Sequence, residues 1–246
     1  MKILLTANVQ KDSKAKRYSK KVLDTLLKAQ IENHIELNWN PKNIILVSNF
    51  DFEFMGVKSI NTELNKFCLT GSKMFAIKWL FENYNFNGEL VWTHDLDCWE
   101  SVPVHLPLYD IGGNLTGIKY VGCAQYSNPK FNGGCIFWKE SAKDIIDEIV
   151  KRLTETTERK EEPTINKVFK SKEYKDRITK LNHTYNVGCS GFSARMGKSL
   201  KPIRVCHFHP NSSHAWRIQN FDKAGKSISD RLEKLLKRYY PNRPNK

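Results

Sequence analysis

Short apolar runs alternate with amphipathic segments through the first hundred residues of the chain. Residues 2–7, 42–49 and 89–94 are predicted to be buried strands, because each is a compact apolar stretch bounded by polar or turn-forming positions. Apolar residues recur at helical spacing in 13–33 and 71–83, which predicts two helices. This strand–helix–strand–helix–strand order predicts a parallel sheet with helices on both faces.

The second half has a different pattern. Two strands and one amphipathic helix are predicted, at 120–125, 133–138 and 141–153. The polar stretch 154–163 is predicted to be a surface loop, with Pro163 as the first residue of the next helix. Ser72 is predicted to cap the helix at 71–83. Residues 227–246 are predicted to form a basic helix that runs into a proline-containing tail.

No internal repeat and no convincing linker interrupts these elements. The expected fold class is therefore α/β, a single domain over 1–246 with a central, mostly parallel mixed sheet flanked by helices. Hydrophobic residues make up 40% of the chain and aromatic residues 11%, which excludes a disordered protein.

The net charge of +14 suggests a polyanionic partner, such as nucleic acid, nucleotide phosphates or an anionic surface. Ordinary solubilising charge is the alternative. The first apolar run is too short for a signal peptide, and no window approaches the length of a membrane span. We therefore expect a cytoplasmic protein.

The six cysteines form no CxxC pair, and several lie in strand-like runs. They are predicted to be reduced core residues of an intracellular protein rather than disulfide partners or zinc ligands. They are Cys68, Cys98, Cys123, Cys135, Cys189 and Cys206.

Two aspartates, Asp95 and Asp97, directly follow the third predicted strand. Ligands of an open parallel sheet bind at the carboxyl ends of the strands, and alternation in an extended chain would turn both side chains to one side, with His94 facing away. Carboxylates are hard ligands that suit Mg²⁺ or Mn²⁺, leaving positions for phosphate oxygens. A metal that bridges the protein to a diphosphate is expected; aspartates that cap a turn are the alternative.

This D-x-D sequence, placed after a βαβαβ half, resembles the GT-A fold of nucleotide-sugar-dependent glycosyltransferases. Three later segments are similar to that family in the same order. "KFNGGCIFWK" (130–139) resembles the strand behind the sugar site, and "EEPTINKVF" (161–169) resembles the helix with a D/E-x-x-x-N pattern. "VCHFHP" (205–210) resembles the late segment whose histidine completes the metal site. The resemblance covers about residues 1–220.

The resemblance implies a nucleotide-binding half over about 1–100 and an acceptor and catalytic half over about 101–220. A basic C-terminal helix and tail would occupy about 221–246. It also implies a divalent metal, Mn²⁺ or Mg²⁺, and a nucleotide sugar as donor, with a UDP-sugar as the expected one.

The metal ligands implied by the resemblance are Asp97, assisted by Asp95, and a returning histidine. His207 is the first candidate, and His209 is the alternative because it lies two residues on along an extended run. A neutral imidazole is an acceptable ligand for Mn²⁺. Either histidine could instead be a hydrogen-bonded core residue.

Donor-binding candidates come from the strand ends and from the matched segments. Lys73 would neutralise diphosphate charge, or would be a solvated lysine on a helix face. Small residues at the sugar floor would let the backbone approach closely, and Asn186 is a further candidate neighbour. The full set is Thr6, Ala7, Asn8, Asn49, Asp51, Lys73, Asp95, Asn132, Gly133 and Gly134.

The catalytic candidates are Asp97, through the metal, and Glu161 or Glu162. An inverting enzyme needs a general base on the acceptor hydroxyl, and the matched helix carries it in inverting relatives. A retaining enzyme would need no such base. The alternative for both glutamates is a solvated position that favours a helix N-terminus.

Charge is the sequence's clue to the acceptor. Residues 11–28 hold seven basic and two acidic side chains, and 223–246 hold eight and two. These patches could follow a phosphate backbone, with stacking from Tyr18, Trp216, Tyr239 and Tyr240. The favoured acceptor is a hydroxymethylated base in double-stranded DNA, as in some phage-type enzymes of this fold, acting in a host cytoplasm. Such a base must be flipped out or reached through a groove.

Two other interpretations stay open. The acceptor could be a glycan, a lipid-linked saccharide or a protein. The C-terminal helix could then be a membrane-surface element, although its leucines 232, 235 and 236 are equally compatible with packing on the domain. A non-catalytic nucleic-acid-binding protein would explain the charge but not the D-x-D sequence and the later matched segments.

Overall fold

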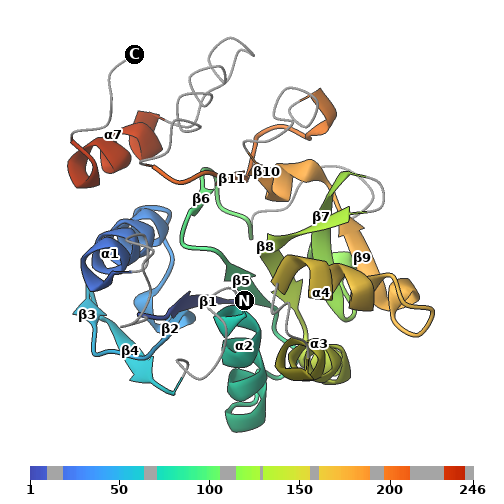
Figure 1. Ribbon diagram of the computed structural model, residues 1–246. Coiled ribbons are helices and arrows are strands. Elements are labelled where there is room, and N and C mark those ends of the chain that lie inside the picture. The colour runs from blue at the N-terminus through green and yellow to red at the C-terminus, as the bar shows by residue number, and fades with distance from the viewer. Residues whose placement is uncertain are drawn as a thin grey trace.

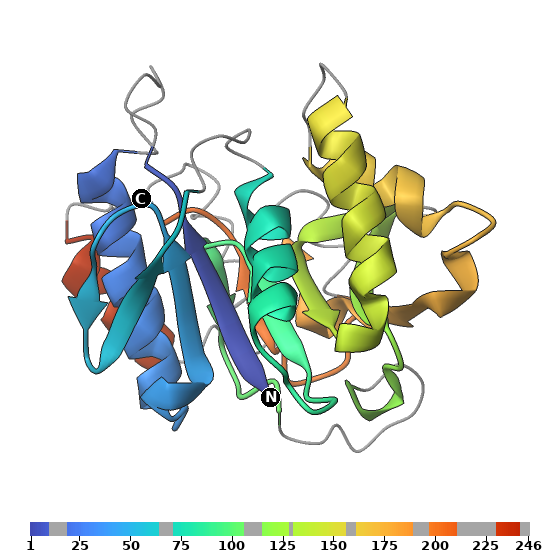
Figure 2. The ribbon, with the colours of Figure 1, turned by 90° about the horizontal axis from the view of Figure 1, so that it is seen from below.

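The computed structural model describes residues 1–9, 19–63, 71–105, 115–127, 130–155, 161–188, 197–210 and 230–241. Its main feature is an eight-stranded sheet in the order β3-β4-β2-β1-β5-β8-β7-β9. Helices cover both faces of this sheet (Figures 1 and 2). The expected α/β class with a mixed, mostly parallel sheet is confirmed.

The predicted parallel half is present. Strand β1 pairs in parallel with β2 on one side and with β5 on the other. Ser19 caps α1, since its side chain accepts a hydrogen bond from the Val22 N–H. The elements are β1 (Lys2–Ala7), α1 (Lys20–Glu36), β2 (Ile44–Ser48), α2 (Ser72–Asn83) and β5 (Val91–His94).

A hairpin that the sequence pattern did not predict extends this half. Strands β3 (Glu53–Phe54) and β4 (Val57–Asn61) are antiparallel, and β4 pairs in parallel with β2. Met55 and Gly56 make the turn with φ of 48° and 77°. With only two residues in β3 and a non-glycine residue at positive φ, neither the strand nor the turn carries the usual sequence signals.

The second half adds antiparallel and parallel strands to the same sheet. β8 lies antiparallel between β5 and β7, and β9 pairs in parallel with β7. The elements are β7 (Val121–Ser127), β8 (Lys130–Trp138), α3 (Lys143–Glu155), α4 (Glu161–Phe169) and β9 (Ile178–Leu181). Short 3₁₀ helices occur at Pro41–Asn43, Leu115–Gly117, Glu140–Ala142, Lys175–Arg177 and His183–Tyr185.

A small second sheet, also not predicted, lies on the same side of the large sheet as α1 (Figure 1). It has the order β10-β11-β6, with β11 parallel to β10 and antiparallel to β6. Its strands are β6 (Cys98–Glu100), β10 (Val187–Gly188) and β11 (Val205–His207). This sheet joins the chain just after the D-x-D sequence to the late histidine segment.

Strand alternation sorts the core onto two faces. On β5, Val91 packs with α2 and α3, whereas Trp92 packs with residues of α1. The same alternation sends His94 to the α1 side, where its ring lies 4.4 Å from that of Trp92 (centroid to centroid). Asp95 is consequently directed toward α2, so strand parity decides which helix meets the first aspartate.

The C-terminal helix α7 (Asp230–Tyr239) lies against α1 (Figure 1). Its apolar face is buried in the protein, with Leu232, Leu235 and Leu236 all at 0% exposure. Arg231 pairs with Glu36 at 2.9 Å, and Arg238 pairs with Glu36 at 2.6 Å. The leucines therefore pack on the domain, and they are not a membrane-facing surface. Among the described residues, no helix has both the length and the apolar character needed to span a bilayer.

Two predicted helix ends are wrong. Gly71, not Ser72, precedes α2, and among the described residues no side chain caps that helix. The Ser72 hydroxyl instead accepts a hydrogen bond from the Asn8 amide. Helix α4 begins at Glu161, so Pro163 is its third residue, and 161–163 do not belong to a loop. Proline fits anywhere in the first turn of a helix, because the backbone N–H groups there have no helical partner. Pro163 therefore indicates the first turn of α4 but not its first residue.

Four cysteines, Cys98, Cys123, Cys135 and Cys206, are free and buried, as predicted. Cys68 and Cys189 lie outside the described residues, and so do Tyr18 and Trp216.

Candidate donor and metal site

Asp95 and Asp97 lie in a turn at the carboxyl end of β5. The Asp95 N–H donates to the Gly134 carbonyl at 2.8 Å, and the Cys98 N–H donates back to the Asp95 carbonyl at 2.9 Å. The chain is therefore not extended here, and the premise that alternation aligns the two carboxylates is wrong. They nevertheless approach one common group, because the Nε2 atom of His207 is 3.7 Å from Asp95 and 3.2 Å from Asp97.

The second aspartate and the histidine are held by the small sheet. The Phe208 N–H donates to the Asp97 carbonyl at 2.8 Å, and His207 pairs opposite Cys98 in the β6–β11 ladder. Burial favours the neutral carboxyl, but the charge and hydrogen bond of His207 outweigh it and lower the pKa of Asp97 to about 2. Burial lowers the pKa of His207, and the Asp97 carboxylate more than reverses this, so its net shift is upward.

The first aspartate, whose side chain is 42% exposed, pairs with the buried ammonium of Lys73. The Lys73 ammonium lies 2.6 Å from Asp95 Oδ1, 2.6 Å from the Gly133 carbonyl and 3.0 Å from Glu161 Oε1. Burial alone would lower the pKa of Lys73, but the charges of Asp95 and Glu161 raise it well above its usual range. Lys73 is only 6% exposed, so the alternative of a solvated lysine on a helix face is wrong.

The two glutamates at the start of α4 both face β8. Glu161 is buried, and burial raises its pKa to about 7 against the opposing charge of Lys73. Glu162 Oε2 accepts a hydrogen bond from the Gly133 N–H at 3.3 Å. One turn later, the Asn166 amide accepts from the Phe131 N–H at 2.8 Å and donates to the Phe131 carbonyl at 2.9 Å. The alternative of a solvated position is therefore wrong for Glu161, whereas Glu162 is half-buried; both stand in the first turn of the helix.

The floor strand β8 needs its glycine at position 134. A Cβ added there would lie 2.3 Å from His207 Cε1 and 2.9 Å from Asp95 Oδ2. Asn132, two residues earlier in the same strand, supports this position, since its Oδ1 accepts from the Gly134 N–H at 2.8 Å and from the Asn186 amide at 2.9 Å. The proposed floor residues and Asn186 thus form one connected group.

The predicted nucleotide contacts at the ends of β1 and β2 differ in what they offer. The Thr6 hydroxyl is buried without a hydrogen-bond partner among the described residues, whereas Ala7 packs in the core at 1% exposure. Asn8 donates to Ser72 Oγ at 2.6 Å.

Beyond β2, the Asn49 amide is bonded at both ends to the Val9 backbone, at 2.8 Å and 2.7 Å, and therefore ties the two strand ends together. Asp51 is exposed and accepts from the Asn61 amide at 3.2 Å.

The ligand atoms of Asp97, Cys98 and His207 lie within 4.8 Å of one another. Cys98 is an unsuitable ligand, because burial raises the pKa of its thiol well above the usual range and Sγ donates to the Gly134 carbonyl at 3.0 Å. An oxygen of Asp97 and a nitrogen of His207 remain as donors. This donor set suits Mn²⁺ or Mg²⁺ better than it suits an ion that prefers thiolate ligands. His209 is outside the trio, although its charge contributes to the low pKa of Asp97.

Beneath the turn, a buried chain of hydrogen bonds runs from the Asp95 carbonyl to Glu100. His94 Nδ1 is 2.9 Å from the Asp95 carbonyl oxygen, and His94 Nε2 is 3.1 Å from His34 Nε2. His34 Nδ1 is 2.8 Å from Glu100 Oε2, which also accepts from Trp39 Nε1 at 2.8 Å. His94 faces away from the aspartate side chains, as the sequence predicted.

Two neighbours of the site were missed by sequence reasoning. Asn166, which anchors α4 to β8, carries the last letter of the matched D/E-x-x-x-N pattern but was given no role. Tyr240, at the end of α7, was assigned to nucleic-acid stacking, yet it is only 7% exposed. Tyr240 comes near Asp97 only because α7, which precedes it, docks by tertiary packing. No local sequence signal therefore links the two residues.

No protein-family profile matches the chain, and no curated protein matches it by sequence. Solved structures with a similar fold include galactosyltransferase LgtC in complex with donor and acceptor sugar analogs. It is 13% identical, with a TM-score of 0.59, over 99% of this chain and 100% of that chain.

A second similar structure is the glycosyltransferase GlyE of Streptococcus pneumoniae TIGR4, 12% identical with a TM-score of 0.56, over 98% of this chain and 63% of that one. A third is a glycosyltransferase involved in glycosylation of the major capsid of PBCV-1. It is 12% identical with a TM-score of 0.50, over 96% of this chain and 99% of that one. At these identities the likeness shows the fold, which is that of GT-A-type glycosyltransferases.

Proposed function

We propose that the protein is a metal-dependent glycosyltransferase that moves a sugar from a nucleotide diphosphate sugar to a hydroxyl acceptor. The observation that carries the proposal is the 3.2 Å approach of His207 Nε2 to Asp97 Oδ1 at the carboxyl end of β5. Ligands of open α/β sheets bind at this edge, and the two side chains come from distant parts of the chain. The similar fold of LgtC, whose structure contains donor and acceptor sugar analogs, supports the same assignment.

Each group of the site has a role in this proposal. Asp97 and His207 would hold the metal, which as a Lewis acid would stabilise charge on the leaving diphosphate. Lys73 stays cationic and holds Asp95 Oδ1, so that Asp95 Oδ2 is directed toward His207. The Gly134 backbone closes the floor and leaves no room for a side chain next to His207.

The general base is tied to stereochemistry. An inverting product requires a base on the acceptor hydroxyl, and Glu161 and Glu162 both lie beside Gly133 of β8. A retaining product requires neither. Glu161→Gln and Glu162→Gln, assayed separately, assign the base if the product is inverted, because only one of them would then abolish turnover.

The deciding experiment incubates the protein with Mn²⁺, a panel of nucleotide sugars and candidate acceptors, followed by mass spectrometry of the products. One nucleotide sugar, expected to be a UDP-sugar, should raise the melting temperature only with Mn²⁺ and should yield a glycosylated acceptor. Asp97→Asn, which is nearly isosteric, should abolish both effects. A protein that binds DNA but shows neither effect with any nucleotide sugar would be a binding module.

For the acceptor, we propose a hydroxymethylated base in double-stranded DNA, and the net charge of +14 supports it. The C-terminal helix gives less support than its composition suggests. Arg231 and Arg238 pair with glutamates of α1, Tyr239 donates to Glu32, and Tyr240 is buried. Transfer to hydroxymethylated DNA, with binding that weakens steeply as salt rises, is the expected result.

A saccharide acceptor is the second candidate, favoured by the structural neighbours. One of them contains an acceptor sugar analog, and another is involved in glycosylation of a viral capsid protein. The acceptor panel therefore includes free saccharides, a lipid-linked saccharide and a glycoprotein. Transfer to any of these without transfer to DNA would replace the DNA proposal and leave the glycosyltransferase proposal intact.

A further inference from the structure

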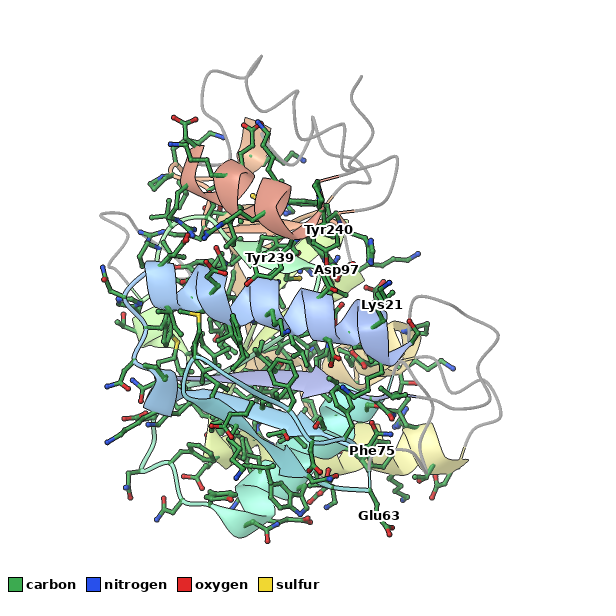
Figure 3. All side chains as sticks on the ribbon, turned by 90° about the vertical axis from the view of Figure 1, so that its left-hand side faces the viewer. Lys21, Glu63, Phe75, Asp97, Tyr239 and Tyr240 are labelled. Atoms are coloured by element: carbon green, nitrogen blue, oxygen red, sulfur yellow. The ribbon has the colours of Figure 1, made fainter. Side chains whose placement is uncertain are left out.

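The residue that follows helix α7 lies at the candidate metal site. The Tyr240 N–H donates to the Leu236 carbonyl at 2.9 Å and so continues the helical hydrogen-bond pattern by one residue. Its ring belongs to a buried cluster with Trp99 and Phe208. Trp99 lies two residues after Asp97, and Phe208 directly follows His207. Figure 3, which labels both residues, shows Tyr240 and Asp97 close together beneath the end of α7.

The hydroxyl of this tyrosine is in an unusual state. It is shut off from solvent and has no hydrogen-bond partner among the residues that the structure describes. Leaving a buried hydroxyl unsatisfied costs about 1–3 kcal/mol, so such a group in a folded protein needs an explanation. Burial raises the pKa of Tyr240, and the Asp97 carboxylate raises it further, which places the two groups within electrostatic reach.

The preceding residue provides a comparison on the same helix. Tyr239 donates its hydroxyl hydrogen bond to Glu32 on α1. This bond fastens α7 to α1 on the side away from the site, together with the Arg238–Glu32 ion pair at 2.6 Å. The two consecutive tyrosines therefore differ: the Tyr239 hydroxyl has its partner in the fold, and the Tyr240 hydroxyl has none among the described residues.

We propose that Tyr240 is a positioning residue of the metal site, whose hydroxyl donates a hydrogen bond to the Asp97 carboxylate when the metal is bound. The proposal rests on the metal site proposed above. Oδ1 of Asp97 is the oxygen that approaches His207, and Oδ2 would be the acceptor. A carboxylate held by a second-layer donor presents its other oxygen in a fixed direction, and such donors contribute about 10–100-fold to metal affinity.

The proposal gives α7 a role that its basic composition did not suggest. The buried leucines and the pairs with α1 dock the helix, and the docked helix carries Tyr240 to Asp97. The C-terminal helix is then part of the site, although it lies beyond residues 1–220, over which the sequence motifs resemble those of the glycosyltransferases.

The test compares Tyr240→Phe with Tyr239→Phe in the full chain. Binding of Mn²⁺ alone is measured by the electron paramagnetic resonance signal of the free ion, and folding is measured by thermal melting without metal. Tyr240→Phe should weaken Mn²⁺ binding about tenfold and leave the melting temperature unchanged or slightly raised, since an unsatisfied hydroxyl is removed. Tyr239→Phe should bind Mn²⁺ as the wild type does and melt about 2–4 °C lower.

The outcomes separate this inference from the proposed function. If the wild-type protein binds Mn²⁺ and Tyr240→Phe binds it equally well, the inference is overturned and the metal site stands. A lower melting temperature of Tyr240→Phe with unchanged Mn²⁺ binding would show a purely structural hydroxyl and would overturn it too. If the wild-type protein binds no Mn²⁺, the metal site itself fails and the inference with it.

Discussion

Asp95 and Asp97 lie in one turn, but each pairs with a different kind of basic side chain. Asp95 is held by Lys73, a buried ammonium that stays charged because two carboxylates surround it. Asp97 is held by His207, an imidazole that can lose its proton and become a metal ligand. The charge of Asp95 is therefore already compensated by a lysine of the chain itself. On the histidine side, the proposed metal ion would take the place of the proton on His207.

This difference explains why the two sides would respond differently to substitution. The lysine side (Lys73, Asp95, Glu161 and Gly133) joins helix α2, helix α4 and strand β8, so its loss is expected to disturb folding. The histidine side (Asp97, His207 and Tyr240) has a more accessible ion pair, with Asp97 31% and His207 19% exposed, than the Lys73–Glu161 pair, at 6% and 10%. Its loss is expected to disturb ligand binding.

The largest expected effect comes from Lys73→Met, which removes the shared cation and leaves buried Glu161 uncompensated. The free energy of unfolding should fall by about 3–5 kcal/mol, as it does when one partner of a buried ion pair is removed. Urea denaturation at pH 7.5 without metal measures the change. A loss below about 1 kcal/mol, the size expected for an exposed lysine, would contradict the buried pair of Lys73 and Glu161.

His207→Gln is the matched substitution on the other side. It should lower the free energy of unfolding by only about 1 kcal/mol, since water can reach the Asp97 carboxylate that it leaves behind. Its binding of Mn²⁺ should nevertheless be lost. Equal destabilisation by Lys73→Met and His207→Gln would remove the distinction between the two sides.

An intermediate effect is expected from Gly134→Ala, because this glycine separates the two sides. The new Cβ would lie 2.3 Å from His207 and 2.9 Å from Asp95, so both must move. Overpacking of this kind costs about 1–3 kcal/mol, and weaker Mn²⁺ binding should accompany it. In the control Gly133→Ala, the nearest atom is the flexible end of Ile165 at 3.3 Å, so both stability and Mn²⁺ binding should change less.

The last expected effect is a pH dependence on the lysine side. The pKa of Glu161 is raised to about 7 in the folded protein, from 4.5 when unfolded, mainly by burial. Its stabilising contribution is therefore complete below about pH 4.5 and is lost as the pH rises through about 7. Without metal, the wild type should lose about 2–3 kcal/mol between pH 5 and 8, and Glu161→Gln should lose less. Identical pH profiles in urea denaturation would show that Glu161 does not titrate in this range.

The parts of the fold that depend on local pattern were predictable. Strands β1, β2 and β5 are compact apolar runs, and α3 has a clear amphipathic period, so each was found near its true bounds. The two-residue strand β3 and the small sheet were not found, because strands of two or three residues carry too little pattern. Helix ends were misplaced where Ser72 and Pro163 suit several positions of a first turn.

The site was predictable as a set of residue types in order along the chain, but not as a set of contacts. The D-x-D sequence and the late histidine were singled out, and His207 does approach Asp97. The burial of Lys73 was not predictable, because it needs Asp95, 22 residues away, and Gly133, 60 residues away, to converge on one ammonium. Tyr240 needs a whole helix to dock before it meets Asp97, and no local property records that.

The buried chain under the turn has a consequence for its protons, assigned here from hydrogen-bond geometry. The carbonyl of Asp95 only accepts, so His94 Nδ1 carries a hydrogen, and the pKa of His94 lies well below its usual value because of burial, which leaves Nε2 bare. His34 must then donate from Nε2 to His94, and its Nδ1 lies 2.8 Å from Glu100 Oε2. The turn that carries both aspartates therefore rests on an ordered series of donors and acceptors, which fixes the direction of the Asp95 carbonyl.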